Sequence, residues 1–181
     1  IKTMKKIAIA LAGSLLLATA TAQAISLSGE AGDDYAGAGF GLGVPGLGAN
    51  VSYGHGKDNN DVYGFGLGYT LPLGAASLTV GGKALYLNQQ HATDGYGVAL
   101  GGGLLFPINR YFSLYGEGYY APDAFSSHID HYVEAKGGVR WQVLRPLNLD
   151  LGYRYINIGG ESGRSDNKVA DTFYLGASFN F

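Results

Sequence analysis

Apolar residues recur at every second position in segment after segment beyond residue 24, and no helical period lasts longer than a turn or two. The segment 62–71, VYGFGLGYTL, shows the pattern clearly. Tyr63, Phe65 and Leu67 share one face with further apolar residues, while glycines and a threonine occupy the other. Because side chains of a strand alternate between its two faces, this period predicts an all-β chain.

Ten segments carry this alternation. They are 25–32, 35–44, 47–54, 62–71, 76–87, 96–106, 111–120, 131–144, 147–156 and 169–181. Most have the roughly 9 to 11 residues that a tilted strand needs to cross a bilayer's hydrocarbon core. Ten strands are therefore predicted, with eight as the alternative because the first hairpin is short and poor in bulky residues.

Connections between these segments alternate in length. Four prolines mark short ones, namely Pro45, Pro72, Pro107 and Pro146. The intervening connections are polar and mostly longer: HGKDNND at 55–61, NQQHATDG at 88–95, APDAFSSHID at 121–130 and NIGGESGRSDNK at 157–168. Outer-membrane barrels alternate short periplasmic turns with longer external loops, and an even strand count keeps both termini in the periplasm. The sequence thus predicts a transmembrane antiparallel up-and-down β-barrel.

The distribution of charge supports lipid as the surroundings of the apolar face. That face, which includes Phe65 and Leu151, carries no charge, and its aromatic content is too large for the lumen of a ten-stranded barrel. A basic residue on it at the bilayer midplane would cost about 2 to 4 kcal/mol. The opposite face carries Glu30 and the residues expected to line the lumen: Lys83, Glu117, Glu134, Lys136, Arg140, Asp150 and Arg154. Two interpretations remain open, a paired polar plug and a narrow charged passage.

The first residues predict export. Lys5 and Lys6 precede an apolar run, and Ala22 to Ala24 form a small-residue cleavage site, so residues 1–24 are expected to be a removed signal peptide. Residues 1–3 precede Met4 and are interpreted as a gene-prediction extension. The mature barrel is then 25–181, located in the outer membrane of a Gram-negative bacterium.

Composition narrows the function further. Removing Lys2, Lys5 and Lys6 from 12 basic residues leaves nine against 14 acidic ones, a net charge of −5 and no basic patch for nucleic acid. The chain has no cysteine, whereas its 14 Tyr, eight Phe and one Trp all lie beyond residue 24. Such aromatics suit interfacial girdles. The last strand alternates outward to a terminal aromatic carboxylate, predicting a signal for the barrel assembly machinery in Phe173, Leu175, Phe179 and Phe181.

Catalysis receives little support. The segment PDAFSSHIDH places Ser, His and Asp together in one loop, but a catalytic triad needs three-dimensional placement that adjacency does not supply. His55, His91, His128 and His131 lie in or beside outer loops without further metal ligands. The glycines 41, 43 and 46 spell G-x-G-x-x-G, yet no helix follows to bind a phosphate. No catalytic residue, cofactor or metal site is predicted.

Several segments carry a resemblance over nearly the whole chain: GDDYAGAGFG, VYGFGLGYTLPLG, TVGGKALY, GEGYYAPDAFSS, RPLNLDLGYRYINIGG and DNKVAD. In this order and spacing they resemble the YfaZ family of enterobacterial outer-membrane proteins. The resemblance implies a porin-type outer-membrane barrel without an assigned substrate or catalytic residues.

The function expected from these observations is a small passive channel for small solutes. The alternative is a closed structural or surface-interaction barrel, and a lipid-modifying enzyme at the outer rim is less favoured. Expected partners are outer-membrane lipids, including lipopolysaccharide bridged through divalent cations to acidic loops, and the assembly machinery. A monomer is favoured.

Overall fold

The computed structural model describes residues 24–44, 46–56, 59–89, 94–160 and 167–181. The predicted signal peptide lies outside these residues apart from Ala24. The long strands are β1 (Ala24–Gly32), β2 (Tyr35–Val44), β3 (Leu47–Gly56), β4 (Asn60–Leu73), β5 (Ala76–Asn88), β6 (Gly95–Pro107), β7 (Phe112–Pro122), β9 (His131–Gln142), β10 (Leu147–Gly159) and β11 (Asn167–Asn180). A short 3-10 turn, η2 (Asp123–Phe125), and the two-residue strand β8 (Ser126–Ser127) lie between β7 and β9. The prediction of ten membrane-length strands is confirmed.

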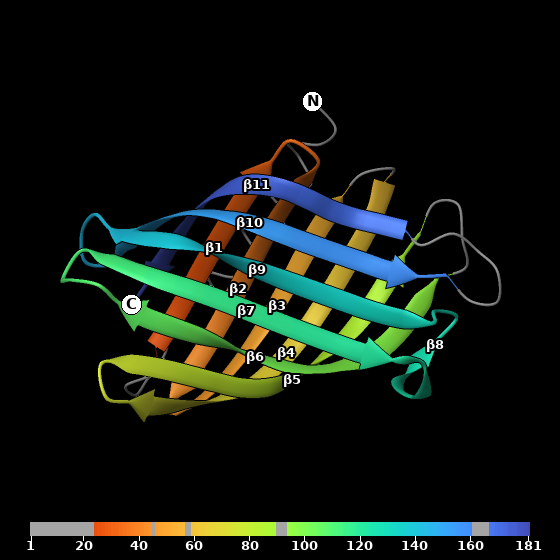
Figure 1. The fold of residues 1–181 in the computed structure, drawn as a ribbon, viewed down its shortest axis with the longest axis horizontal. Helices are drawn as coiled ribbons and strands as arrows, with labels where there is room; N and C mark the ends of the chain where they lie inside the picture. The colour runs from red at the N-terminus through yellow and green to blue at the C-terminus, as the bar shows by residue number, and fades with distance from the viewer. Residues whose placement is uncertain (1–23, 45, 57–58, 90–93, 161–166) are drawn as a thin grey trace.

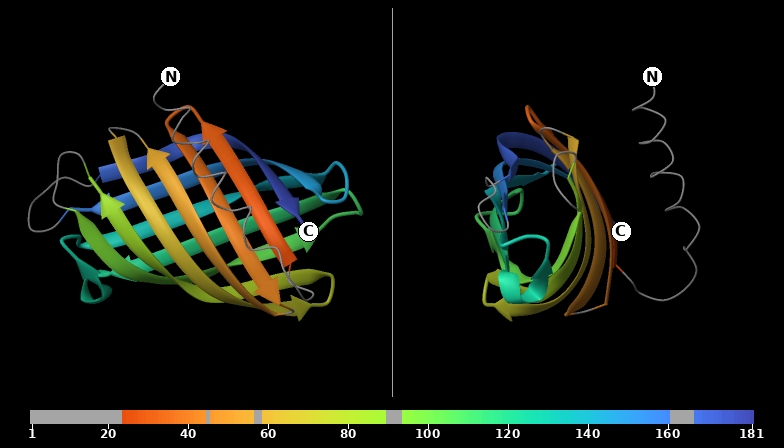
Figure 2. Two further views of the ribbon diagram at one scale, coloured as in Figure 1. Left: turned by 180° about the vertical axis from the view of Figure 1, so that it is seen from behind. Right: turned by 90° about the vertical axis from the view of Figure 1, so that its right-hand side faces the viewer.

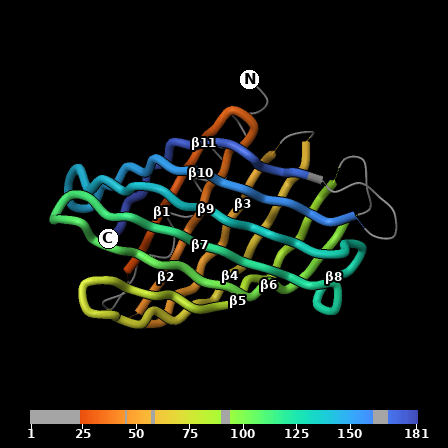
Figure 3. Tube along the Cα trace, viewed as in Figure 1, coloured from red at the N-terminus to blue at the C-terminus, as the bar shows by residue number. Residues whose placement is uncertain are grey.

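The long strands form one closed antiparallel sheet (Figures 1 and 3). Each pairs with its neighbour in the chain, β8 adds to β6, and the pairing of β1 with β11 closes the barrel. Strands β1 to β4 make one side and β7, β9, β10 and β11 the other, as the two further views show (Figure 2). At the seam, Ile25 and Phe181 exchange backbone hydrogen bonds of 3.1 and 2.8 Å. Closure pairs every long strand on both sides, which a strand in lipid requires.

The two ends of the barrel differ. One end, here called the turn end, holds the connections β2–β3, β4–β5, β6–β7 and β9–β10 together with the C-terminus (Figure 1). Gly46 and Gly74 have φ of 85° and 65° in its two tightest turns, a conformation that glycine adopts without a steric cost. The other end, the loop end, holds the remaining connections.

The loop between β3 and β4 is shorter than the sequence predicted. The polar segment 55–61 looked like a seven-residue loop, but β3 continues to Gly56 and β4 begins at Asn60. His55 and Asp61 face each other across these strands, and His55 Nδ1 lies 2.7 Å from Asp61 Oδ1. The hydroxyl of Tyr53 also donates to Asp61 at 2.8 Å. Residues 55, 56, 60 and 61 of this polar segment therefore belong to the paired strands of this hairpin and not to its loop.

Large apolar side chains cover the outside of the barrel. The exposed ones include Val51, Phe65, Leu67, Val98, Leu100, Leu104, Leu114, Leu149, Leu151, Phe173 and Leu175. Aromatic pairs flank this band, with Tyr53 against Tyr63 towards the loop end and Phe112 against Trp141 at the turn end. A contiguous exposed apolar band between aromatic girdles is typical of a membrane-spanning barrel. Among the described residues, no helix is long and apolar enough to cross a membrane.

Candidate functional site in the barrel lumen

Inward side chains at the turn end are small and polar, and they follow a regular cross-strand pattern. Four of them lie directly opposite a glycine of the neighbouring strand: Ser26 opposite Gly41, Ser28 opposite Gly39, Asn50 opposite Gly66 and Ser52 opposite Gly64. A Cβ added to any of these glycines would lie within 3 Å of the polar side chain that it faces. Glycine thus lets the hydroxyl and amide groups lie along the wall, which leaves the lumen open here.

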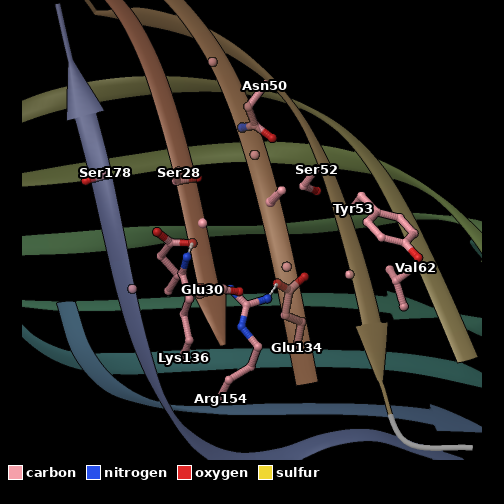
Figure 4. A pocket seen from close by; sticks show the side chains of 18 of the residues that line it. Ser28, Glu30, Asn50, Ser52, Tyr53, Val62, Glu134, Lys136, Arg154 and Ser178 are labelled. Atoms are coloured by element: carbon pink, nitrogen blue, oxygen red, sulfur yellow. Dashed lines mark hydrogen bonds and ion pairs between the residues drawn. The ribbon is translucent and has the colours of Figure 1, made fainter. Parts of the chain in front are cut away.

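These residues line a cavity of about 290 Å³. The side chains of three residues that line it point into the barrel and are nevertheless exposed to solvent: Ser28, Asn50 and Asn180. The cavity is therefore a solvated space that opens at the turn end, here called the vestibule. Figure 4 shows Ser28, Asn50, Ser52 and Ser178 on its wall.

The structure places all seven charged residues that the sequence assigned to the lumen on the wall of this cavity, together with Glu30. Two ion pairs, which are separate from the others, join adjacent strands. Arg140 donates from Nε and Nη2 to both carboxylate oxygens of Asp150 at 2.7 and 2.9 Å, and Lys136 Nζ lies 3.5 Å from Glu117 Oε2. Both pairs lie beside the vestibule.

The other four charged residues form a chain of ion pairs that we call the crossbar: Lys83, Glu134, Arg154 and Glu30. Lys83 Nζ lies 2.8 Å from Glu134 Oε2. Arg154 lies 3.0 Å from Glu134 and 2.6 Å from Glu30 (Figure 4). Lys83 is on β5 and Glu134 on β9, and Arg154 is on β10 and Glu30 on β1, so these two pairs join strands that are not neighbours. The crossbar therefore passes through the interior of the barrel.

Tyrosines hold the crossbar in place. The hydroxyl of Tyr132 donates to Glu134 at 2.9 Å, and Arg154 donates to the hydroxyl of Tyr35 at 3.3 Å. Lys83 Nζ lies 4.2 Å from the ring centre of Tyr119. Side chains of the crossbar are only 7 to 15% exposed. At that exposure, the described residues leave no wide water-filled passage at this level of the lumen.

Beyond the crossbar, towards the loop end, the buried side chains are mostly apolar, although Asn60 is also buried there. The fully buried apolar side chains at this level form what we call the apolar layer: Leu87, Ile129, Tyr132, Ile156, Ile158 and Val169. Ile129 enters from the connection between β8 and β9, and the backbone N–H of Asp130 holds that connection by donating to the carbonyl of Gly159 at 3.0 Å. The inside of the barrel is thus open at the turn end, and the described residues fill it at the loop end.

Sequence reasoning missed this apolar layer. It assigned polar character to the inward face throughout, but Leu85 and Leu87 share that face with Lys83. The alternation along β5 could have shown this, because residues 83, 85 and 87 are at every second position and therefore share one face. Neither the pairing of Lys83 with Glu134 nor the role of Tyr35 could be read from the sequence, because both depend on contacts across the lumen.

The residues of the expected C-terminal signal share the lipid face. Phe173, Leu175, Phe179 and Phe181 are all exposed on the outside of the barrel, and the rings of Phe179 and Phe181 stack 6.4 Å apart. Leu175 and Phe179 pair with both β1 and β10, and Phe173 pairs with β10. This surface lies beside the closing seam.

The loop histidines do not assemble a triad among the described residues. Ser127 Oγ lies 3.2 Å from His128 Nδ1, but in the ranges that the structure covers no hydrogen bond or ion pair joins His128 to a carboxylate. His91 lies outside the described residues. Within those ranges, no group of three His, Cys, Asp or Glu residues is close enough to hold a metal ion.

A closed antiparallel barrel with an apolar outer band and an enclosed polar interior is the architecture of an outer-membrane β-barrel protein. The family model described as YfaZ precursor matches residues 4–181, so the chain belongs to the YfaZ family. Outer membrane protein YfaZ of Escherichia coli (strain K12) is 46% identical over 180 residues, covering 98% of this chain and 100% of that protein. The chain is an outer-membrane protein, as the sequence predicted.

Solved barrels also align with the chain at low sequence identity. The NanC porin aligns with a TM-score of 0.49 and 11% identity, covering 88% of this chain and all of the other. The KdgM porin in complex with disordered oligogalacturonate aligns with a TM-score of 0.46 and 10% identity, covering 87% of this chain and 99% of the other.

Proposed function

We propose that this outer-membrane barrel is closed to solutes in its resting state. It acts as a structural or surface-interaction protein rather than as a steadily conducting channel. The crossbar is the observation that carries this proposal, because it occupies the lumen with buried ion pairs between strands that are not neighbours. The apolar layer above it adds a second obstruction. A solute crossing both would have to separate buried charges and then pass a region of mostly apolar side chains, and both steps are unfavourable.

The second candidate is a small passive channel, and the vestibule is the observation that favours it. The polar cavity extends from the turn end to the crossbar, since Glu30 and Arg154 are part of its wall, and it also touches Tyr132 and Ile156 of the apolar layer. Displacement of the crossbar and of the apolar layer would join the vestibule to the loop end. Conduction therefore requires a second conformation.

Planar bilayers containing the purified, refolded protein test the two functions. The closed barrel is expected to give no discrete conductance steps at a protein load at which an open porin, added in the same way, gives many. Folding is checked by the shift in electrophoretic mobility between heated and unheated samples. Regular steps from the wild-type protein would overturn the closed barrel, and their alteration by Arg140→Ala, which removes the bidentate pair with Asp150 beside the vestibule, would assign them to this lumen.

We also propose that the exposed C-terminal aromatic residues are read during assembly. Phe181→Ala keeps the backbone bonds to Ile25 but removes the terminal ring, and is expected to lower the amount of folded barrel in outer membranes several-fold. Leu144→Ala, an exposed apolar residue at the same end, is the matched control. Equal levels of both variants in membrane fractions would contradict a recognition role for Phe181.

A further inference from the structure

The vestibule has the hydrogen-bonding chemistry of a ligand site. One side of its wall, formed by β1, β3 and β11, presents hydroxyl and amide groups, and glycines of β2 and β4 keep this wall thin. Ser28 and Ser178 lie directly opposite each other on β1 and β11, and Ser178 in turn lies opposite Asn148 of β10. Serine hydroxyls both donate and accept hydrogen bonds, and amides carry both functions on separate atoms. Such a wall suits a ligand that carries several hydroxyl groups.

The charges around the vestibule favour a neutral ligand. Its wall contains four acidic residues, Glu30, Glu117, Glu134 and Asp150, and four basic residues, Lys83, Lys136, Arg140 and Arg154. All eight take part in ion pairs with one another. An anion or cation entering this space would find no unpaired charge of opposite sign on the described residues of its wall, and it would lose hydration without compensation.

Two buried polar atoms in this wall have no hydrogen-bond partner among the described residues. They are the Oγ of Ser178 and the Nε of Arg154, and each of these residues is 6% exposed. Both residues line the vestibule. A buried polar group without a partner is unfavourable, and a ligand that hydrogen-bonds to it removes that cost. A ligand that satisfies both atoms needs a hydrogen-bond acceptor for the N–H group of Arg154 and a further polar group for the hydroxyl of Ser178.

We propose that the vestibule binds a small uncharged polyhydroxylated molecule of monosaccharide size, which enters from the turn end. The volume of about 290 Å³ lies at the lower limit of about 300 Å³ for pockets that hold drug-sized ligands, so the occupant is smaller than these. This inference goes beyond the proposed function and does not depend on whether the crossbar opens.

Isothermal titration calorimetry of the folded full-length mature barrel in detergent micelles tests it, with three probes of one size. Glucose is neutral, glucuronate carries a negative charge, and glucosamine carries a positive charge at pH 6. Glucose is expected to give a saturable binding signal, and both charged sugars are expected to bind at least about tenfold more weakly. Absence of a saturable signal with glucose would overturn the proposal, as would equal or tighter binding of a charged sugar.

Two variants test the location of the site. Ser178→Ala removes the unpartnered hydroxyl and is expected to weaken glucose binding about tenfold while leaving the unfolding midpoint unchanged or higher. Gly39→Val places a side chain against Ser28 Oγ, 2.8 Å from the added Cβ, and is expected to abolish binding. Ser77→Ala, on β5 and outside the cavity wall, is the matched control and should bind as the wild type does.

Unchanged glucose affinity in folded Ser178→Ala and Gly39→Val would overturn the assignment to the vestibule. Calorimetry detects binding in either conformation of the lumen. Failure of this experiment would therefore leave the closed barrel intact, and conductance steps in bilayers would leave the ligand site intact.

Discussion

Replacement of Glu134 by alanine is expected to lower the free energy of unfolding of the barrel by about 3 to 5 kcal/mol, the range for removing one partner of a buried ion pair. Glu134 holds both Lys83 and Arg154, at 2.8 and 3.0 Å, and also accepts a hydrogen bond from Tyr132. Its loss leaves two cations beside each other in a poorly solvated part of the lumen. Urea unfolding of the barrel in lipid vesicles, followed by tryptophan fluorescence, measures the change.

Glu117→Ala is the matched control for this prediction. Glu117 is also an inward glutamate, but its side chain is 40% exposed and lies 3.5 Å from Lys136. A solvated pair of this kind contributes about 0 to 1 kcal/mol. Similar losses of unfolding free energy in the two variants would contradict the prediction that the buried pairs of the crossbar stabilise the barrel more than the solvated pair does.

Introduction of arginine at Leu151 is expected to cost about 2 to 4 kcal/mol, the range for a basic residue on the lipid face at the bilayer midplane. Leu151 lies in the middle part of β10, is 57% exposed on the outside, and is flanked across the sheet by Val139 and Leu175. Its surroundings in the membrane are therefore acyl chains. The same unfolding experiment in vesicles measures the loss.

Ser28→Arg is the control for the arginine itself. Ser28 faces the vestibule, where a long charged side chain can reach solvent at the turn end. A small effect at Ser28 with a large one at Leu151 is the expected result. The reverse order would mean that the inner and outer faces of the barrel have been exchanged.

The sequence predicted the strands and their faces well because both follow from a local rule. Alternation along each segment assigns every side chain to one of two sides, and a charged residue such as Arg154 decides which side is enclosed. Two short turns are also determined locally, because Gly46 and Gly74 can adopt the positive φ that these turns require. All ten long strands therefore overlap the segments that the pattern placed, although β3, β4 and β10 extend into segments predicted as loops.

The depth profile of the lumen was not predicted, because it depends on contacts between distant strands. Glu134 has partners on β5 and β10, and only the closed barrel brings Lys83 to it. Ile129 belongs to a connection that looked polar, yet its side chain is buried in the apolar layer. A single apolar residue within a polar loop does not show in the sequence whether its side chain points into the barrel or into solvent.

The vestibule opens at the end of the barrel that carries the short turns and the C-terminus. In outer-membrane proteins these features belong to the inner side of the membrane. The hollow of this barrel is then an extension of the periplasm, and it shares the water, the ions and the pH of that compartment. Molecules that occupy it must have been made in the cell or have crossed the outer membrane by another route.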